Sequence, residues 1–262
     1  MFARTTLSLM LLLAFAGTAL AAHPLITDDA GTQGMGKYSL EINAALSRDK
    51  ENLGGVSTRE DGAEAAASLS AGIGDSVDIV VASPWVWSRV REDGAVTSEE
   101  NGIGDLSLQL KWRFFDREGL SLAVKPVITL PTGDENRGLG NGKVSYGIGL
   151  ILTRQFEPFA LHVNGAYTRN EFRLDADKKI NRSDIWNASV AAAGQVSKSL
   201  QLVADLGVES NGYRGSHTSP AYILGGAIYS LREDLDLDFG VKRGLNGPEA
   251  DMTWLAGVTL RF

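Results

Sequence analysis

DMTWLAGVTLRF, residues 251–262, is the stretch of sequence that decides the fold. Every second position carries an apolar or aromatic side chain: Trp254, Ala256, Val258, Leu260 and Phe262 alternate with Thr253, Gly257, Thr259 and Arg261. Successive side chains of a strand point to opposite faces, so this pattern predicts a β-strand with one apolar face. The chain ends on that face.

The same alternation recurs through the rest of the chain. In residues 104–115, apolar Leu106, Leu108, Leu110, Trp112 and Phe114 alternate with Asp105, Ser107, Gln109, Lys111 and Arg113. The pattern predicts about twelve strands of roughly ten residues, the length that a tilted strand needs to cross a bilayer. We place them at residues 37–48, 62–72, 76–89, 104–115, 120–130, 144–155, 159–169, 183–195, 200–210, 219–231, 235–243 and 251–262.

The connections between these strands alternate in length. Short turns are expected near residues 74–75, 116–119, 156–158, 197–199 and 233–234, and longer polar loops at residues 49–61, 90–103, 131–143, 170–182, 211–218 and 244–250. Short periplasmic turns and longer extracellular loops are typical of outer-membrane barrels. The sequence therefore predicts an all-β fold: a transmembrane, antiparallel, up-and-down β-barrel with both termini in the periplasm.

Aromatic side chains fall near both predicted membrane interfaces, as they do in such barrels. Those near the outer interface are Trp85, Trp87, Trp186 and Trp254, and those near the inner interface are Tyr38, Trp112, Phe114, Phe159 and Phe262. A last strand that ends on an aromatic residue also resembles the signal by which bacterial barrels reach their assembly machinery. That resemblance implies the assembly machinery as a partner of the C-terminal strand, through Phe262.

The N-terminus reads as a secretory signal peptide, residues 1–21, with Arg4 before an apolar run and a small-residue cleavage site. Residues 22–36 lack periodicity and read as a periplasmic segment or a plug of the lumen, and residues 37–262 form the barrel. We expect the cleaved protein in the outer membrane of a Gram-negative bacterium, in contact with its lipid.

Composition excludes several classes of protein. The 262 residues contain no cysteine, which excludes disulfides and a lipid-modified cysteine. A net charge of -7 argues against a nucleic-acid partner. No residue pattern indicates a cofactor or a metal site. Asp28 and Asp29 could cap a turn or bind a cation, and the glycine-rich residues 138–142 lack the strand-to-helix context of a nucleotide loop.

Charged and polar residues on the interior phase of the strands are the candidate pore lining. They are Glu41, Asp78, Asp105, Lys111, Arg113, Lys125, His162, Asn164, Asp205, Glu209, Asp236 and Asp238. The basic members cluster on neighbouring strands and several acidic members on others. Opposed walls of this kind would either set a transverse field that orients a small solute or pair across the lumen and close it.

Three stretches resemble the MetA-pathway phenol-degradation family of outer-membrane proteins: HPLITDDAGT at residues 23–32, GIGDL at 102–106 and LPTGD at 130–134. The resemblance covers the whole mature chain and implies a barrel of this size that passes small organic or aromatic compounds. It implies no residue-level mechanism.

The sequence thus predicts a non-enzymatic channel or transporter for passive uptake of a small solute, aromatic or hydrophobic. Three alternatives remain. One is a structural barrel with a closed lumen, and another is a secreted soluble barrel or sandwich. The third is an outer-membrane hydrolase that uses His162 and Asn164. No Gly-x-Ser-x-Gly elbow supports it, and two polar lumen residues hydrogen-bonded to neighbouring strands are the favoured explanation of both side chains.

Overall fold

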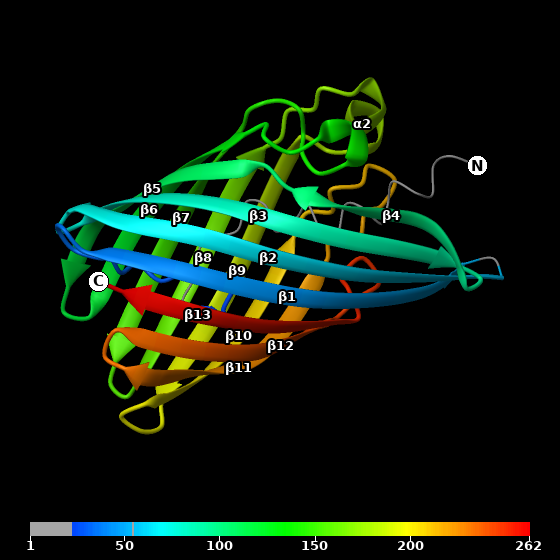
Figure 1. The fold of residues 1–262 in the computed structure, drawn as a ribbon. Coiled ribbons are helices and arrows are strands. Elements are labelled where there is room, and N and C mark those ends of the chain that lie inside the picture. Colours follow the sequence, from blue (N-terminus) through cyan, green and yellow to red (C-terminus); the bar gives the residue numbers. More distant parts are fainter. Residues whose placement is uncertain (1–22, 54) are drawn as a thin grey trace.

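The structure, a computed structural model, describes residues 23–53 and 55–262. These residues form one closed antiparallel β-barrel of twelve strands, which confirms the predicted fold class (Figure 1). In the described part of the chain, no helix combines the length and apolar character needed to cross a membrane. The predicted signal peptide, residues 1–21, lies outside the described residues.

Thirteen strand segments make up the sheet, because one of the twelve barrel strands is interrupted. The longer loops add a short 3-10 helix, η1 (Glu135–Arg137), and a six-residue α-helix, α2 (Asp175–Ile180). The strands are β1 (Tyr38–Leu53), β2 (Val56–Gly74), β3 (Val77–Glu92), β4 (Ala95–Ile103), β5 (Leu106–Arg117), β6 (Leu120–Leu130), β7 (Ser145–Phe156), β8 (Phe159–Arg169), β9 (Asp184–Gln195), β10 (Leu200–Glu209), β11 (Ala221–Arg232), β12 (Leu235–Gly244) and β13 (Met252–Arg261).

The interrupted strand consists of β4 and β5. The strand β3 pairs with β5 from Val77 to Ala82 and with β4 from Trp85 to Glu92, so β4 and β5 lie end to end beside it. The break falls at Gly104, whose N–H donates to the Pro84 carbonyl. This break turns the side chain of the next residue, Asp105, into the barrel.

Two of the predicted loops are strands instead. Residues 49–61 and 90–103 belong mostly to β1, β2, β3 and β4, which continue well past the other strands as two hairpins (Figure 1). At the second tip, Asp93 (φ 47°) and Gly94 (φ 87°) form the tight turn that positive φ angles allow. The prediction was wrong there because both faces of these extensions are polar, so apolar alternation ends while backbone pairing continues.

The barrel closes where β1 meets β13. Their pairing runs from Ser39 opposite Arg261 to Arg48 opposite Met252. At the end of this seam the Tyr38 N–H donates to the Phe262 carbonyl (2.8 Å), and the two rings stack with centroids 5.7 Å apart. The C-terminal strand therefore closes the barrel against the first strand.

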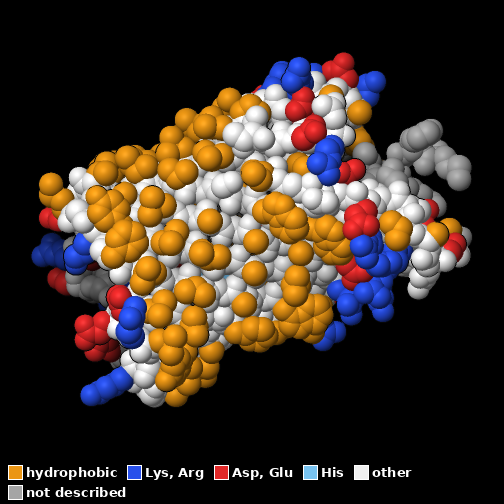
Figure 2. Space-filling view, viewed as in Figure 1, with side chains coloured by type: hydrophobic (Ala, Val, Ile, Leu, Met, Phe, Trp, Pro, Cys, Tyr) orange, Lys and Arg blue, Asp and Glu red, His pale blue; other side chains and the backbone are white. Residues whose placement is uncertain are grey.

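Apolar side chains cover the outside of the barrel in a broad band (Figure 2). Leu150 is 61% exposed and Phe239 is 54% exposed, whereas the interior positions Ser39 and Thr253 are almost completely buried. Apolar side chains thus face outward and polar side chains inward, the reverse of a soluble protein. This is the arrangement of a membrane barrel, whose outer face contacts hydrocarbon and whose inner face is polar. The short turns gather at the end of the barrel that holds Phe262, and the longer loops at the other end.

Candidate functional site

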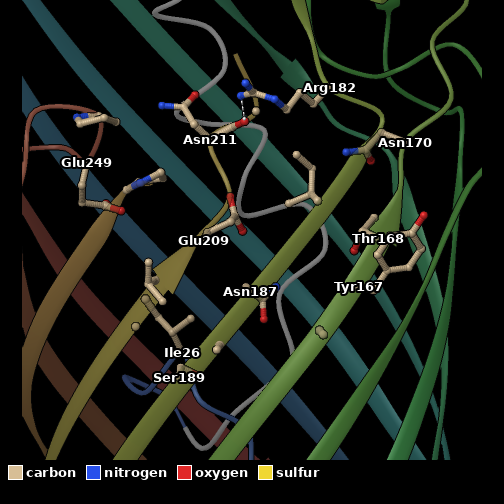
Figure 3. A pocket seen from close by; sticks show the side chains of 18 of the residues that line it. Ile26, Tyr167, Thr168, Asn170, Arg182, Asn187, Ser189, Glu209, Asn211 and Glu249 are labelled. Carbon is tan, nitrogen blue, oxygen red and sulfur yellow. Dashed lines mark hydrogen bonds between the residues drawn. The ribbon is translucent and has the colours of Figure 1, made fainter. Parts of the chain in front are cut away.

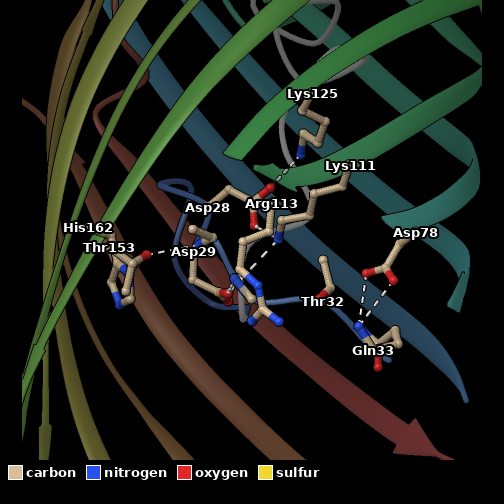
Figure 4. Close-up of polar contacts among 12 residues, drawn as sticks. Asp28, Asp29, Thr32, Gln33, Asp78, Lys111, Arg113, Lys125, Thr153 and His162 are labelled. Atoms are coloured by element: carbon tan, nitrogen blue, oxygen red, sulfur yellow. Dashed lines mark hydrogen bonds and ion pairs between the residues drawn. The ribbon is translucent and has the colours of Figure 1, made fainter. Parts of the chain in front are cut away.

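Residues 23–33 lie inside the barrel and contact its walls (Figure 4). Thr27, Asp28 and Ala30 are fully or almost fully buried. This lumen segment contains no helix or strand, so its backbone groups need partners from elsewhere. Side chains of the surrounding strands supply them.

One carboxylate of the lumen segment faces two lysines of the wall. Asp28 lies 3.0 Å from Lys111 on β5 and 2.6 Å from Lys125 on β6, and all three side chains are buried. Asp29 approaches Lys111 at 3.9 Å and so balances the second positive charge. Burial tends to raise the pKa of the Asp29 carboxyl, but Lys111, His162 and the Gly31 N–H outweigh it and hold that pKa below its usual range.

Asp205 on β10 binds the same segment through hydrogen bonds from another wall of the barrel. Its carboxylate accepts hydrogen bonds from the backbone N–H groups of Ile26 and Thr27, both 2.8 Å, and from the Thr27 hydroxyl at 2.7 Å. The Tyr222 hydroxyl donates to it as well, at 3.3 Å. Hydrogen bonds to an ionised acceptor are the strong class, so Asp205 fixes the segment where it passes this wall.

Further contacts hold both ends of the segment. His23 pairs with Asp238 on β12. Toward the short-turn end, the Gln33 N–H donates to both oxygens of Asp78, at 3.1 and 3.0 Å. The segment therefore runs between β12 and β3 and is tied at each end to an interior carboxylate.

His162 and Asn164 take part in the same tethering. The Thr153 hydroxyl lies 2.9 Å from His162 Nδ1 and accepts from the Ala30 N–H at 2.9 Å. The Asn164 amide lies against the peptide of Asp28, and in the amide orientation that satisfies both of its polar atoms it donates to the Asp28 carbonyl at 2.9 Å. The group beside His162 is thus a threonine engaged with the lumen segment.

The other predicted interior residues have separate roles. Asp105 accepts from the Gly133 and Asn141 N–H groups, at 2.9 and 2.8 Å, and so holds the β6–β7 loop across the opening. Asp236 pairs with Arg261 at 2.6 Å. Arg113 donates to the Asp75 carbonyl at the rim of the short-turn end, and Glu41 is buried on β1.

A chamber of about 540 Å³ lies between the lumen segment and the longer loops (Figure 3). Ile26 of the lumen segment borders it, together with inward-facing Asn187, Ser189 and Glu209 of β9 and β10. Arg182 braces the loops beside it by donating from Nη1 to the carbonyls of Asn211, Tyr213 and Ser216. The chamber is thus a preformed space, bordered on the side of the longer loops by loops that hydrogen bonds hold together.

Carboxylates outnumber cations around this chamber. Its lining includes the cations Lys125, Arg182 and Lys242 and the carboxylates Asp49, Glu51, Glu60, Asp105, Glu209 and Glu249. Lys242 lies 2.6 Å from Glu249 and 5.4 Å from the centre of the Tyr222 ring. Among the described residues, no cluster of histidine, aspartate and glutamate has the arrangement of a metal site.

The three sequence motifs that resemble a known family meet around this interior. HPLITDDAGT contains most of the lumen segment, while GIGDL and LPTGD are joined by the hydrogen bond from Gly133 to Asp105. A Cβ on Gly133 would lie 2.1 Å from the Leu139 carbonyl oxygen, so the loop fold requires glycine there. The motifs therefore specify the segment and the loop that border the chamber.

Comparison with known proteins supports this fold and this family. The family model described as "Putative MetA-pathway of phenol degradation" matches residues 27–262. The chain is similar to the COG4313 outer membrane channel from Pseudomonas putida F1, with 16% identity and a TM-score of 0.70 over 89% of this chain and 98% of that one.

Two other solved barrels are less similar. The NanC porin has 9% identity and a TM-score of 0.57 over 84% of this chain and 98% of its own. The translocator domain of the autotransporter NalP from Neisseria meningitidis has 14% identity and a TM-score of 0.57 over 87% and 89%. The chain matches no curated protein sequence to a significant level. These identities are low, so the similarity of the structures concerns the fold alone.

Proposed function

Because this chain belongs to the MetA-pathway of phenol degradation family, we propose that it is an outer-membrane channel for passive uptake of small aromatic or hydrophobic compounds. The solved channels and porins that share its fold support a role in passage across the membrane. The proposal places the protein in the outer membrane of a Gram-negative bacterium after removal of residues 1–21.

The observation that carries this proposal is the chamber above the lumen segment. Its volume of about 540 Å³ lies within the range of roughly 300–1,000 Å³ typical of small-molecule sites. Its lining combines the apolar Ile26 with the polar Asn187 and Ser189. A compound with one aromatic ring and one hydroxyl group matches both kinds of lining.

Passage toward the periplasm requires the lumen segment to move. Its described tethers are ion pairs and hydrogen bonds, which break and re-form without covalent chemistry. Gly34 (φ 86°) and Gly36 (φ 76°) stand where the segment joins β1, and glycine allows the backbone to rotate there at little steric cost. The proposed transport step is a displacement of residues 23–33 about these glycines.

The structural barrel with a closed lumen is the second candidate. The same tethers favour it, since Asp28 and Asp205 hold the segment from two walls and bury it in the lumen. The two functions differ in whether the segment leaves its tethers on the timescale of solute entry.

Transport measurements on the refolded mature protein separate the candidates. Planar-bilayer conductance and phenol uptake into liposomes are measured for residues 22–262 and for a variant that begins at residue 37. We expect uptake above protein-free liposomes for the full mature chain and faster uptake for the shortened one. Uptake by the shortened barrel alone would favour the structural barrel, and uptake by neither would contradict the channel.

A further inference from the structure

A group of arginines lies on the outside of the barrel, directly beyond the apolar band. Figure 2 shows the blue side chains beside the end of the band that carries the β1–β4 extensions. The cross-strand register sets Arg48, Asp61, Arg89 and Glu99 side by side in one row. The next row contains Lys50, Arg59 and Arg91. We call these residues the outer basic patch.

The patch has a defined height relative to the membrane. Trp87 lies one step closer to the apolar band than Arg89 on the outward face of β3, and two residues of strand span about 7 Å. Tryptophan marks the membrane interface in barrels of this kind. The guanidinium groups therefore lie at the depth of the lipid headgroups, on the side of the longer loops.

Positive charge is in excess on this face. The five cations of the patch face two carboxylates, and Arg243 extends the first row beyond Met252. The inward face of the same extensions carries Asp49, Glu51 and Glu60, of opposite sign. Along these extensions arginine and lysine therefore occupy the outward face, and aspartate and glutamate occupy most of the inward face.

The arginines are held in place but keep donors available. One carboxylate, Asp61, accepts from Arg48 (3.2 Å), Arg59 (2.8 Å) and Arg91 (2.7 Å). Three guanidinium groups offer about fifteen N–H donors, far more than one carboxylate accepts. Arg48 and Arg59 keep 47% and 39% of their side chains exposed. The cluster thus has unused, oriented donors.

Arg89 holds another guanidinium group in place beside this cluster. It lies over the Trp87 ring at 5.1 Å and pairs with Glu99 at 2.6 Å. Its Nε is buried and has no hydrogen-bond partner in the described part of the chain. Below it, the outward face of β2 is lined by Ala63, Ala65 and Ala67, which leave a shallow apolar surface leading to the patch.

We propose that the outer basic patch binds the phosphate groups of lipid A, the phosphorylated glycolipid of the outer leaflet, with an acyl chain along the alanines of β2. Arginine suits this partner because its planar fork binds phosphate bidentately and remains charged at every physiological pH. The apolar surface favours a lipid-borne phosphate over inorganic phosphate. The inference rests on the orientation of the barrel and is independent of its cargo.

The test compares two lipids on the refolded mature protein in detergent. Native mass spectrometry measures binding of bis-phosphorylated lipid A and of the same lipid after removal of both phosphates. We expect at least a tenfold preference for the phosphorylated form. Equal binding of both lipids would overturn the proposal, as would complete displacement of lipid A by millimolar inorganic phosphate.

Variants then locate the site. The triple variant R48Q/R59Q/R91Q is expected to weaken lipid A binding by about 100-fold, since each basic residue near a membrane surface contributes roughly a factor of five. The control R117Q/K198Q/R232Q removes the same charge from the opposite rim and is expected to bind as the parent does. Heat-modifiable gel mobility verifies folding. A folded triple variant with unchanged affinity would contradict the assignment.

Discussion

Lys125 Nζ lies 2.6 Å from Asp28 Oδ2, so a buried lysine of the barrel wall holds a residue 97 positions away in the sequence. Lys111 approaches the other oxygen of the same carboxylate at 3.0 Å. The pairing makes Asp28 the point at which the lumen segment is joined electrostatically to β5 and β6. Removal of the Asp28 carboxylate should therefore release the lumen segment before it destabilises the barrel.

The first prediction concerns Asp28→Asn. Removing one partner of a buried ion pair costs about 3–5 kcal/mol, because the remaining charges stay buried without compensation. We expect this cost to be relieved by detachment of residues 23–33, and single-channel conductance to rise. The control Asp29→Asn removes a carboxylate 3.9 Å from Lys111 and should raise conductance much less. Equal conductance of the parent and D28N would refute the tether.

The second prediction concerns the size of the chamber. Ser189 faces the chamber from β9, while its neighbour Val190 is 42% exposed on the outside. Ser189→Trp fills part of the space and should slow phenol uptake into liposomes severalfold, whereas Val190→Trp should leave the rate unchanged. If both variants transport like the parent, the solute does not cross this chamber.

The third prediction concerns the apolar band. Leu150 lies midway along β7 and faces outward. An arginine at the bilayer midplane costs about 2–4 kcal/mol, while one near the interface costs about 0–1 kcal/mol. Leu150→Arg should therefore lower the free energy of unfolding in lipid vesicles by the larger amount. Val196→Arg, at a short turn, should lower it by the smaller one, and equal effects would argue against the assigned membrane position.

The fourth prediction separates two roles of Phe262. Its ring stacks on Tyr38, and such aromatic pairs contribute about 0.5–1.5 kcal/mol. Phe262→Ala and Tyr38→Ala should therefore destabilise the refolded barrel similarly. If the barrel-assembly machinery also recognises the Phe262 side chain, only Phe262→Ala should reduce the fraction of the protein that is folded in cell envelopes. Equal yields of the two variants in cells would leave Phe262 with a packing role alone.

The strands were predictable because each one carries its own periodic pattern. In β5 the alternation placed Lys111 inward and Trp112 outward, and the structure has both side chains so. Contact with lipid requires an apolar side chain at every second position of a strand, while the positions between them face the polar interior. A short stretch of sequence is therefore enough to identify each strand. The same reading missed the extensions of β1 to β4, where no lipid imposes the contrast.

The tethers of the lumen segment were not predictable in this way. Asp28 stood out only as one of two adjacent carboxylates, and its partners come from strands much later in the chain. Asp29 does accept from the Gly31 N–H, which is the local turn contact that its sequence context suggested. A segment without periodicity carries no register, so its position inside the barrel is set by contacts that sequence spacing does not encode.

The seam between β1 and β13 also dictates an order of events in folding. Its partners, such as Ser39 and Arg261, are more than 200 residues apart, whereas hairpins such as β7–β8 pair residues close together. Contacts of large sequence separation form late, because the ends of a long chain must first be brought together. Until that step, β1 and β13 are two open sheet edges, each able to pair with a foreign strand. The pairing of β13 with β1 thus decides when the barrel stops being prone to aggregation.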